Sequence, residues 1–557
     1  MSEKHPIEFK LFAPYNEEVA VIGEWNEWKP QPMEKGPDGW WRKNIKLADG
    51  KYQYKFRVKS KTFYQEGETV DIADPRAVRV SRDEHENAYV YIENGKHVFI
   101  NYEWQHEDVP LAANRELVIY EMHIQDFIGS DLTDEKSVFQ QAIDKLDYLR
   151  DLGINAVELM PVNDYPGDYS WGYNPRFPFA VENNYGTPDD FAQFVDECHA
   201  RGIRVILDVV FNHSEDANPL ADIDHTYWFH GENPDDAAFH WGTKLNFEFY
   251  DENMNIYPAR EHVKDVILHW IHTFQIDGLR FDATAILDNF DALHYWNQAI
   301  YQAVGDIKPF ITIAEHVPQD PAVTGYDGPL DAAWHESFSK QLQSITVGVS
   351  IAYREPNDLN ELLTSMQPTK EGYTSPINVV NYIDNHDQER IMWLLGEGGG
   401  FFDDEAFKRQ KMAAAVLLTA PGIPMLWMGQ EFGVASESGI EPHPMDWTLL
   451  QNDRNADLRN YYYGLVHLRT GTSALQSNNI EILHADAERM FTVYRRWDDE
   501  GGQVIVAANL GGQYNSFEVA AAGGDWHEYV FDYTVSADGD CLRDEVAEHQ
   551  VKVYLKS

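Results

Sequence analysis

The pattern of apolar and polar positions divides the chain into three regions. In residues 1–105, apolar and polar residues alternate over short runs such as EVAVIG and YQYKFRV, which predicts the strands of a β-sandwich. In residues 106–445, short apolar runs alternate with amphipathic helical stretches, as the βα units of a parallel sheet require. After about residue 440 the helical pattern fades, and runs such as QVIVAANL predict a C-terminal β-sandwich domain over 446–557.

Eight apolar runs of the central region are candidate strands. In chain order they are ELVIYEMHI, INAVELMPV, IRVILDVVF, DGLRFDA, PFITIAEH, LDAAWHE, INVVNYIDN and GIPMLWMG, and the sixth gives the weakest signal. Eight strands with helices between them are what a closed barrel of βα units needs. We therefore predict an α/β fold, a (β/α)8 TIM barrel with a short insertion at 214–250, placed between the two β domains.

Two helices of this region can be outlined from their ends. Thr133 is placed to cap a helix that runs to Gly153, directly before the run INAVELM. Thr187 and Pro188 are placed to begin a second helix, which ends at Gly202 before the run IRVILDVVF. Both segments follow the order helix, glycine, strand that a barrel repeats.

Composition and charge narrow the class of partner. The chain has 557 residues, 43% of them hydrophobic, so we expect a folded protein of two or three domains. Ninety-two acidic residues against 44 basic ones give a formal charge of -48, which would repel nucleic acid and anionic membrane surfaces. A neutral polymer meets no such repulsion. We therefore expect no nucleic acid and no membrane as partner.

The cysteines and the first residues indicate a compartment. The two cysteines, Cys198 and Cys541, do not form a disulfide framework. The start MSEKHPIEFK lacks the basic and apolar regions of a secretory signal, and no apolar stretch of about 18 residues occurs. These features favour a cytoplasmic protein, which we expect to be a monomer or a small homo-oligomer.

Polar side chains follow the third and fourth candidate strands. After the third come Asn212 and His213, which either face a ligand or form a turn with a satisfied histidine. In the fourth, Arg280 and Asp282 share one face, because side chains alternate along a strand. An arginine beside an aspartate holds that carboxylate ionised, as a nucleophile requires. A buried structural ion pair explains this motif equally well.

The fifth and seventh candidate strands also end in ionisable residues. Glu315 follows an apolar run whose burial would raise its pKa enough for a general acid, or it caps the next helix. Asp384, His386 and Asp387 either face the same mouth or hold a turn. Barrel strands converge at their carboxyl ends, so we expect these groups to meet there. Two carboxylates flanking a sugar are the requirement of glycoside hydrolysis, and a separation of about 5–5.5 Å means retention.

The runs DVVFNH, GLRFDA, IAEH and DNHD resemble, in order and spacing, the four signature regions of the α-amylase superfamily, glycoside hydrolase family 13. The resemblance implies that Asp282 is the nucleophile, Glu315 the acid/base, and Asp387 a residue that stabilises the transition state. The same resemblance implies substrate-binding or supporting roles for Tyr173, Asp208, His213, Arg280 and His386.

The first region resembles the family 48 carbohydrate-binding modules in the runs VIGEWNEWKP, GWWRKNIKL and GKYQYKFRV. The resemblance leaves two roles for its tryptophans. Trp25, Trp28 and Trp40 either form a platform for a sugar or pack the sandwich against the barrel.

The whole layout resembles a group that contains glycogen branching enzymes, isoamylase-type debranching enzymes and maltooligosyltrehalose trehalohydrolases. DVVFNH lacks the proline and alanine that usually precede this histidine in bacterial branching enzymes, and DNHDQ is nearer to hydrolases. We therefore expect a retaining enzyme that hydrolyses α-1,4 bonds of α-glucans or malto-oligosaccharides. The alternatives are, in order, a branching transferase and a trehalohydrolase. A glucan-binding protein without activity would lack one of the three carboxylates, and all three are present.

The resemblance also raises the question of a bound structural calcium ion. Many amylases hold a structural calcium after the third strand, and Asn212 matches one of the family's ligand positions. Glu215, Asp216, Asp222 and Asp224 would supply oxygen ligands, but the insertion is short and no more acidic than the rest of the chain. For this reason we do not predict a metal, although a structural calcium stays open. No other cofactor is needed, because neither step of a double displacement transfers electrons.

Overall fold

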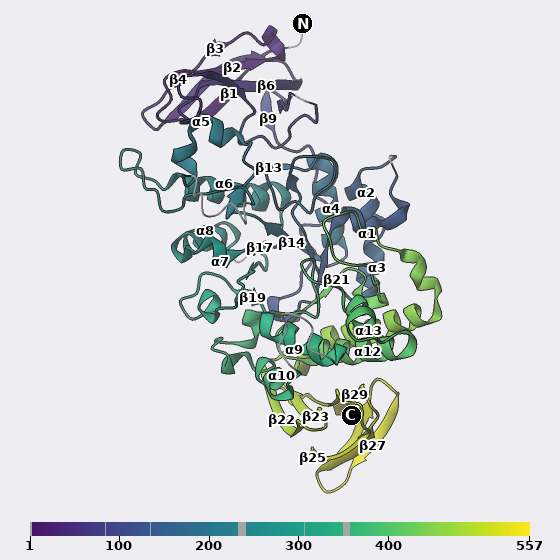
Figure 1. Ribbon diagram of the computed structural model, residues 1–557. Helices are drawn as coiled ribbons and strands as arrows, with labels where there is room; N and C mark the ends of the chain where they lie inside the picture. Colours follow the sequence, from purple (N-terminus) through teal and green to yellow (C-terminus); the bar gives the residue numbers. More distant parts are fainter. Residues whose placement is uncertain are drawn as a thin grey trace.

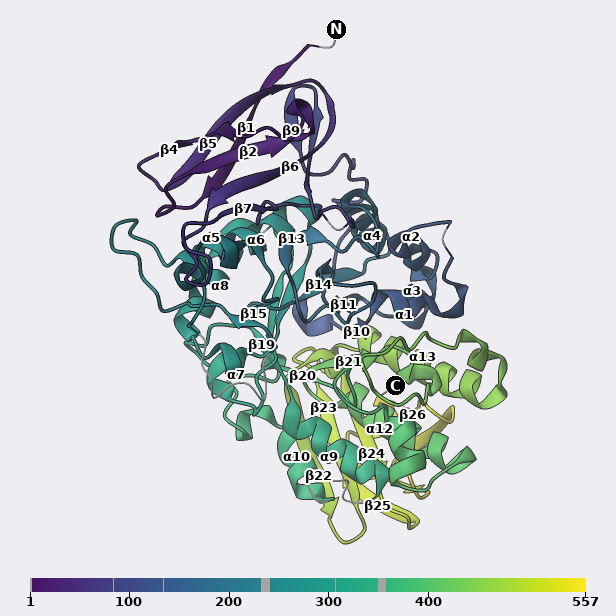
Figure 2. The same cartoon turned by 45° about the horizontal axis from the view of Figure 1, so that its top comes forward.

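The protein consists of three parts arranged along one axis. The computed structural model describes residues 3–83, 85–133, 135–231, 241–305, 307–348 and 357–556. Figure 1 shows the N-terminal sheets at one end, the C-terminal sheets at the other and the barrel between them, and Figure 2 shows the same order from a second direction. The limits near residues 105 and 445 that the sequence suggests stay predictions.

The eight candidate strands form a closed parallel barrel in their chain order. Its strands are β10 (Ile119–Met122), β11 (Ala156–Leu159), β14 (Arg204–Val209), β17 (Gly278–Phe281), β18 (Ile311–Ala314), β19 (Ala332–Trp334), β20 (Val379–Asn381) and β21 (Ile423–Trp427). The predicted TIM barrel is therefore confirmed. The strand at the weak sixth signal, β19, is three residues long, as is β20.

The helix expected after Thr133 differs from the prediction. Two helices occupy this stretch, α2 (Val138–Ile143) and α3 (Leu146–Leu152), and the first is capped by Ser137. The Ser137 hydroxyl accepts a hydrogen bond from the backbone N–H of Gln140, and the side-chain oxygen of Gln140 accepts one from the backbone N–H of Ser137. Thr133 as the cap was therefore wrong, whereas Gly153 ends α3 in the left-handed conformation as predicted.

The second predicted helix is confirmed as α4 (Pro188–Ala200), capped by Thr187. The inward stripe of α4 is fully buried, so the helix packs against the barrel as its periodicity indicates. The other helices around the barrel are α1 (Ile124–Ile128), α5 (Pro219–Trp228), α6 (Pro258–Phe274), α7 (Thr284–Leu287), α8 (Phe290–Val304), α9 (Glu336–Val347), α10 (Leu359–Ser365), α11 (Ile391–Trp393) and α12 (Asp403–Thr419).

The N-terminal part contains two sheets. One has the order β1-β5-β4 and the other β3-β2-β6-β8-β9, with β7 paired to β6. The strands are β1 (His5–Phe12), β2 (Val19–Gly23), β3 (Gln31–Pro32), β4 (Glu34–Lys35), β5 (Trp40–Leu47), β6 (Gly50–Lys59), β7 (Thr69–Ile72), β8 (Ala88–Glu93) and β9 (Lys96–Val98). Alternate residues of β1 and β6 are buried, as their period of two predicts.

Side chains of the N-terminal part, which we call the N-terminal module, form hydrogen bonds with the backbone of α5. α5 is interrupted at Asp224, whose backbone angles are not helical. The hydroxyl of Thr62 enters the interruption: it donates to the carbonyl of Ala221 and accepts from the backbone N–H of His225, at 3.0 Å. Ser60 donates in the same way to the carbonyl of Asp222 at 2.7 Å. The module therefore completes hydrogen bonds that α5 cannot make by itself.

The C-terminal part begins with a helix that the sequence pattern did not suggest. α13 (Asp453–Gly471) follows the barrel and packs against α12 and α3, so the expectation that helical structure fades after residue 440 was wrong. The strands that follow are β22 (Asn479–Asp486), β23 (Phe491–Trp497), β24 (Gln503–Asn509), β25 (Asn515–Ala520), β26 (Gly524–Glu528), β27 (Tyr533–Ala537), β28 (Cys541–Val546) and β29 (Gln550–Lys556). They form one six-stranded and one two-stranded sheet.

Length and apolarity decide whether a helix can cross a bilayer. Among the helices within the described ranges, none is both long and apolar enough to do so.

Candidate active site

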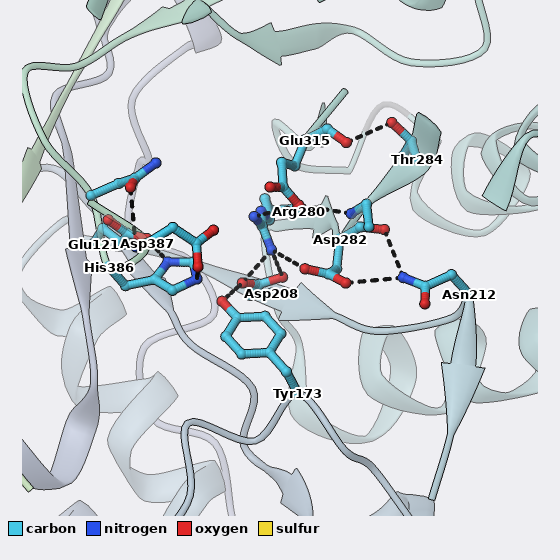
Figure 3. Close-up of polar contacts among 12 residues, drawn as sticks. Glu121, Tyr173, Asp208, Asn212, Arg280, Asp282, Thr284, Glu315, His386 and Asp387 are labelled. Carbon is cyan, nitrogen blue, oxygen red and sulfur yellow. Dashed lines mark hydrogen bonds and ion pairs between the residues drawn. The ribbon is translucent and has the colours of Figure 1, made fainter. Parts of the chain in front are cut away.

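The residues predicted from the strand ends meet at the carboxyl end of the barrel. Asp208 lies in β14 beside Arg280 of β17, its partner in the register of the two strands. Asp282 and Glu315 directly follow β17 and β18, which are also paired. Figure 3 shows these side chains pointing toward one another around Arg280.

Arg280 is fully buried and contacts three carboxylates. Its Nη1 donates to both oxygens of Asp208 at 2.7 Å and to Oδ1 of Asp282 at 3.0 Å. Its Nη2 forms an ion pair with Oε2 of Glu315 at 3.0 Å. The ring of Trp334 covers the guanidinium, with its centroid 4.1 Å away. One cation therefore compensates a group of acids that could not be ionised together without it.

The two carboxylates expected to be catalytic differ in how their oxygens are held. In Asp282, Oδ1 accepts from Arg280, and Oδ2 accepts from the side chain of Asn212 at 3.0 Å. All contacts of the Glu315 carboxylate go to Oε2, which also accepts from the backbone N–H of Ala283 at 2.8 Å. Within the described ranges, Oε1 of Glu315 makes no hydrogen bond. Asp282 is thus fixed at both oxygens, and Glu315 keeps one oxygen for an incoming ligand.

The backbone at Ala283 is part of this arrangement. Ala283 adopts φ of 44°, in the left-handed region that residues with a side chain rarely enter. The conformation aims its N–H at Glu315, while Thr284 donates from its backbone and its hydroxyl to the carbonyl of Glu315. Local backbone strain is therefore held where the acid is positioned.

Burial sets the direction of both pKa shifts. Burial raises the pKa of Glu315 above its ordinary value, against the opposing charge of Arg280, as a general acid requires. Burial also raises the pKa of Asp282, and the guanidinium opposes the rise without cancelling it. The expected influence of Arg280 is present, but burial outweighs it. The two carboxyls are therefore distinguished by their hydrogen bonds and not by the direction of their pKa shifts.

His386 and Asp387 lie on the other side of this group. The His386 ring stacks on Tyr173, with centroids 4.9 Å apart and planes 14° from parallel. Its Nδ1 contacts Oε1 of Glu121 at 2.6 Å, and its Nε2 lies 3.3 Å from Oδ1 of Asp387. The Asp387 side chain is 52% exposed, so it faces the open mouth. Tyr173 completes the connection by donating its hydroxyl to Asp208.

His213 is at the mouth but makes different contacts from the other predicted residues. Its Nε2 lies 2.7 Å from the backbone carbonyl of Tyr173, and its Nδ1 contacts Asn212. The exposed ring of Trp241 stands beside it, with centroids 6.2 Å apart. His213 therefore links the loops that carry Tyr173 and Asn212.

Two glutamates below the mouth were not among the predicted residues. Glu121 of β10 and Glu158 of β11 are register partners, and each is 1% exposed. Both stand inside apolar strand runs, where a single acidic residue is unusual. The sequence argument weighed only the ends of strands and therefore passed over them.

The proposed calcium ligands do not fit a common site. Asp216 accepts from Thr243, Asp222 from Gln65, and Asp224 from Thr226, so these carboxylates serve separate partners. Asn212, another of the five candidates, directs its amide to Asp282. Across the described residues, no three His, Cys, Asp or Glu side chains gather as metal ligands would. We derive no step of the reaction through a metal.

Two of the three candidate tryptophans of the N-terminal module, Trp25 and Trp40, contact aromatic residues of the module. Trp25 lies on Phe9, with centroids 5.0 Å apart, and donates its indole N–H to Gln31. Trp40 lies against Phe12 at 5.3 Å and lines a cavity together with Trp228 of the barrel.

Comparison with known proteins decides the family. Residues 131–243 and 246–460, more than half of the chain, match the model of the alpha amylase catalytic domain. The chain belongs to the α-amylase family. Residues 1–77 match carbohydrate-binding module 48, the isoamylase N-terminal domain. Both resemblances read from the sequence are thereby confirmed, and the protein is an enzyme of this family.

The chain is similar to curated proteins that include trehalohydrolases and branching enzymes. The malto-oligosyltrehalose trehalohydrolase of Saccharolobus solfataricus is 28% identical over 462 residues, which are 77% of this chain and 73% of that protein. The 1,4-alpha-glucan branching enzyme of Nitrosomonas europaea is 27% identical over 555 residues, with 90% and 71% covered. The pullulanase type I of Bacillus subtilis, solved with maltose, has the same fold at 20% identity, with a TM-score of 0.81 and 100% and 86% covered.

Proposed function

We propose that the protein is a retaining hydrolase that cleaves α-1,4-glucosidic bonds of α-glucans by double displacement. The observation that carries the proposal is the pair Asp282 and Glu315, held by the two ends of one guanidinium with one oxygen of Glu315 left free. Two carboxyls on opposite sides of a glycosidic bond are the requirement of a retaining mechanism.

In the first step, a carboxylate oxygen of Asp282 bonds to the anomeric carbon, and the bond from that carbon to the leaving sugar breaks. The free Oε1 of Glu315 gives its proton to the departing oxygen. The raised pKa of Glu315 keeps that proton in place until it is used. The hydrogen bonds from Arg280 and Asn212 fix the attacking carboxylate, so its orientation need not be found during the reaction.

In the second step, the Glu315 carboxylate takes a proton from the incoming hydroxyl. The oxygen of that hydroxyl bonds to the anomeric carbon, the ester to Asp282 breaks, and the configuration is retained. Water as the acceptor gives hydrolysis, and a sugar hydroxyl gives transfer. Asp387, exposed at the mouth, is the group that would bind ring hydroxyls and stabilise the positive charge of the transition state. The Tyr173 ring supplies an apolar face for the same sugar.

A trehalohydrolase is the second candidate. It is favoured by several curated relatives with that name at 27–29% identity. A local feature also supports hydrolysis: Asn385 precedes His386 where branching enzymes usually have serine, and its side chain accepts from the backbone N–H of Asp387 at 3.1 Å. Branching enzymes are relatives at similar identity, so the transferase is the third outcome of the test.

The experiment is to incubate the purified protein separately with amylose and with a malto-oligosyltrehalose. Reducing ends, free trehalose and α-1,6 linkages are followed together, the last by proton NMR. New reducing ends from amylose without new α-1,6 signals are expected. Release of trehalose in preference to cleavage of amylose would establish the trehalohydrolase, and new α-1,6 linkages with few reducing ends would replace hydrolysis by branching.

Matched variants test the assigned residues. D282N and E315Q are expected to lose turnover on every glucan and to remain folded. D251N is the control, because Asp251 is buried and hydrogen-bonded to Tyr15 and Tyr227 away from the mouth. Turnover close to wild type in either active-site variant, with D251N active as well, would refute the mechanism. The cytoplasmic location and the monomer or small oligomer stay predictions.

A further inference from the structure

Two buried carboxyl groups lie side by side beneath the mouth of the barrel. Glu121 and Glu158 are register partners on the adjacent parallel strands β10 and β11, so their side chains leave the sheet on the same face. The contact from Glu121 to His386 shows that this face is the barrel interior. Each residue is 1% exposed, so no bulk water separates them from the site.

The oxygens of these carboxyls are incompletely satisfied. Oε1 of Glu121 contacts Nδ1 of His386 at 2.6 Å, whereas Oε2 has no hydrogen-bond partner in the described part of the chain. Neither oxygen of Glu158 has a partner there. An ionised carboxylate without a partner is too costly to bury, but a protonated one is neutral and carries a donor. Glu121, the register partner of Glu158, offers an acceptor for this donor, since its Oε2 has no partner among the described residues.

The electrostatic surroundings favour the same distribution of charge. Burial, followed by the neighbouring Glu121, raises the pKa of the Glu158 carboxyl well above its usual range. For His386, burial lowers the pKa, but Asp387 and Glu121 outweigh it and bring it to about 9. The other charged or titratable groups around Glu158, Glu121 and His386 are Tyr173, Asp208 and Arg280. The pocket beside His386 is also lined by His123, Asp126, Arg390, Glu437 and His443.

We propose that Glu158 is a positioning residue, which stays protonated at neutral pH and donates its hydroxyl to Oε2 of Glu121. Glu121 can then remain ionised and hold His386 as an imidazolium. With Nδ1 engaged by Glu121, the Nε2–H of His386 is a donor toward Asp387, 3.3 Å away, and toward a sugar hydroxyl beside it. The hydrogen-bonded series Glu158, Glu121 and His386 thus keeps Nε2 of His386 a hydrogen-bond donor beside Asp387.

The first test compares two replacements of Glu158. E158M keeps the length of the side chain and removes the donor, so Glu121 loses the partner that keeps it ionised. E158Q restores a donor that cannot ionise. Loss of the Glu315 proton sets the first break of the alkaline limb of the kcat/KM profile, and loss of the His386 proton steepens the limb above it. In E158M, we expect this steeper part of the limb to move to lower pH, and in E158Q we expect it to return to the wild-type position. Equal profiles for wild type and E158M, or a shift in E158Q as large as in E158M, would overturn the proposal.

The second test removes the anion itself. E121Q is expected to move the same limb by about 1–3 pH units, since that is the effect of losing a close opposite charge. E431Q is the control, because Glu431 is a buried glutamate that accepts from Tyr120 and Tyr148 without contacting the mouth. E431Q likewise removes a buried carboxyl and should leave the limb in place. A limb that moves equally in E431Q would overturn the proposal, because the shift would then follow from the loss of any buried carboxyl.

The third test needs no substrate, which matters because the kinetic tests rest on the proposed function. With histidine labelled by nitrogen-15, the His386 signals are identified by their absence from H386Q. At pH 7.5, wild type and E158Q should show both ring nitrogens protonated, and E121Q should show a clearly larger neutral fraction. A neutral His386 in wild type would overturn the proposal even if the enzyme hydrolyses glucans. If no glucan is turned over but the imidazolium is present, only the proposed function fails. E121Q also decides the matter if E158M does not fold.

Discussion

Replacing Arg280 by methionine tests how far one cation supports the site. Arg280 has no exposed surface, and it pairs with Asp208, Asp282 and Glu315 at 2.7–3.0 Å. R280M keeps most of the apolar volume but leaves three buried carboxyls without a counterion. Removing one partner of a buried ion pair costs about 3–5 kcal/mol, so we expect at least this loss in the free energy of unfolding at pH 8.

The loss should depend on pH in a defined direction. Burial already raises the pKa values of Asp208, Asp282 and Glu315 in the folded protein, and removing Arg280 raises them further. A carboxyl whose pKa is higher in the folded state contributes a penalty that is absent below its unfolded pKa. The penalty grows as the pH rises and is complete above the folded pKa. R280M should therefore lose less stability at pH 5 than at pH 8, as measured by urea titration at both values.

Arg496 supplies the matched control. It is equally buried, but it donates to backbone carbonyls, among them those of Leu475 and Asn479 at 2.9 and 2.7 Å. R496M also leaves acceptors unpaired, at about 1–3 kcal/mol for a buried group. Carbonyls do not titrate, so this loss should be the same at both pH values. A pH-independent loss in R280M, or the same pH dependence in R496M, would refute the reasoning.

Four further outcomes are expected. D282N should melt at a higher temperature than wild type at pH 8 although it is inactive, because it removes a buried carboxyl with a raised pKa; a lower melting temperature would contradict this. E315Q should still be glycosylated by α-maltosyl fluoride, whose leaving group needs no proton, and mass spectrometry would detect the adduct on Asp282. Y173F loses its hydrogen bond to Asp208 but keeps the stacking on His386, so kcat/KM should fall about 3–10-fold, and an unchanged value would make the bond irrelevant. EDTA should change neither turnover nor melting; a loss that calcium restores would show a metal site.

The sequence predicted the barrel well because each strand is a local signal. An apolar run bounded by helical periodicity is visible even where the strand is short, as in β19. Ends of helices were less certain. Thr133 and Ser137 are both good caps, and only the hydrogen bonds of the folded chain select Ser137. α13 was missed because few of its residues form an apolar stripe, and its burial depends on partners far along the sequence.

The prediction of the site was correct for residues at strand ends, but it missed residues inside the strands. Asp282, Glu315 and Arg280 meet as expected, because parallel strands bring their carboxyl ends together. The bond from Asn212 to Asp282 depends on a loop conformation that no local pattern specifies. Glu121 and Glu158 carried a signal, a single acid inside an apolar strand, but its meaning required the register of β10 and β11.

The insertion of Thr62 into α5 has a consequence for how the chain is built. In a barrel made without the N-terminal module, the carbonyl of Ala221 and the N–H of His225 would lose their hydrogen bonds to Thr62. During synthesis, the module leaves the ribosome before α5, and domains generally fold as units from the N-terminus. The surface that completes α5 is therefore in place when the helix is made. Since α5 follows the strand that carries His213, a part of the chain that is made earlier contacts the segment next to the mouth as that segment folds.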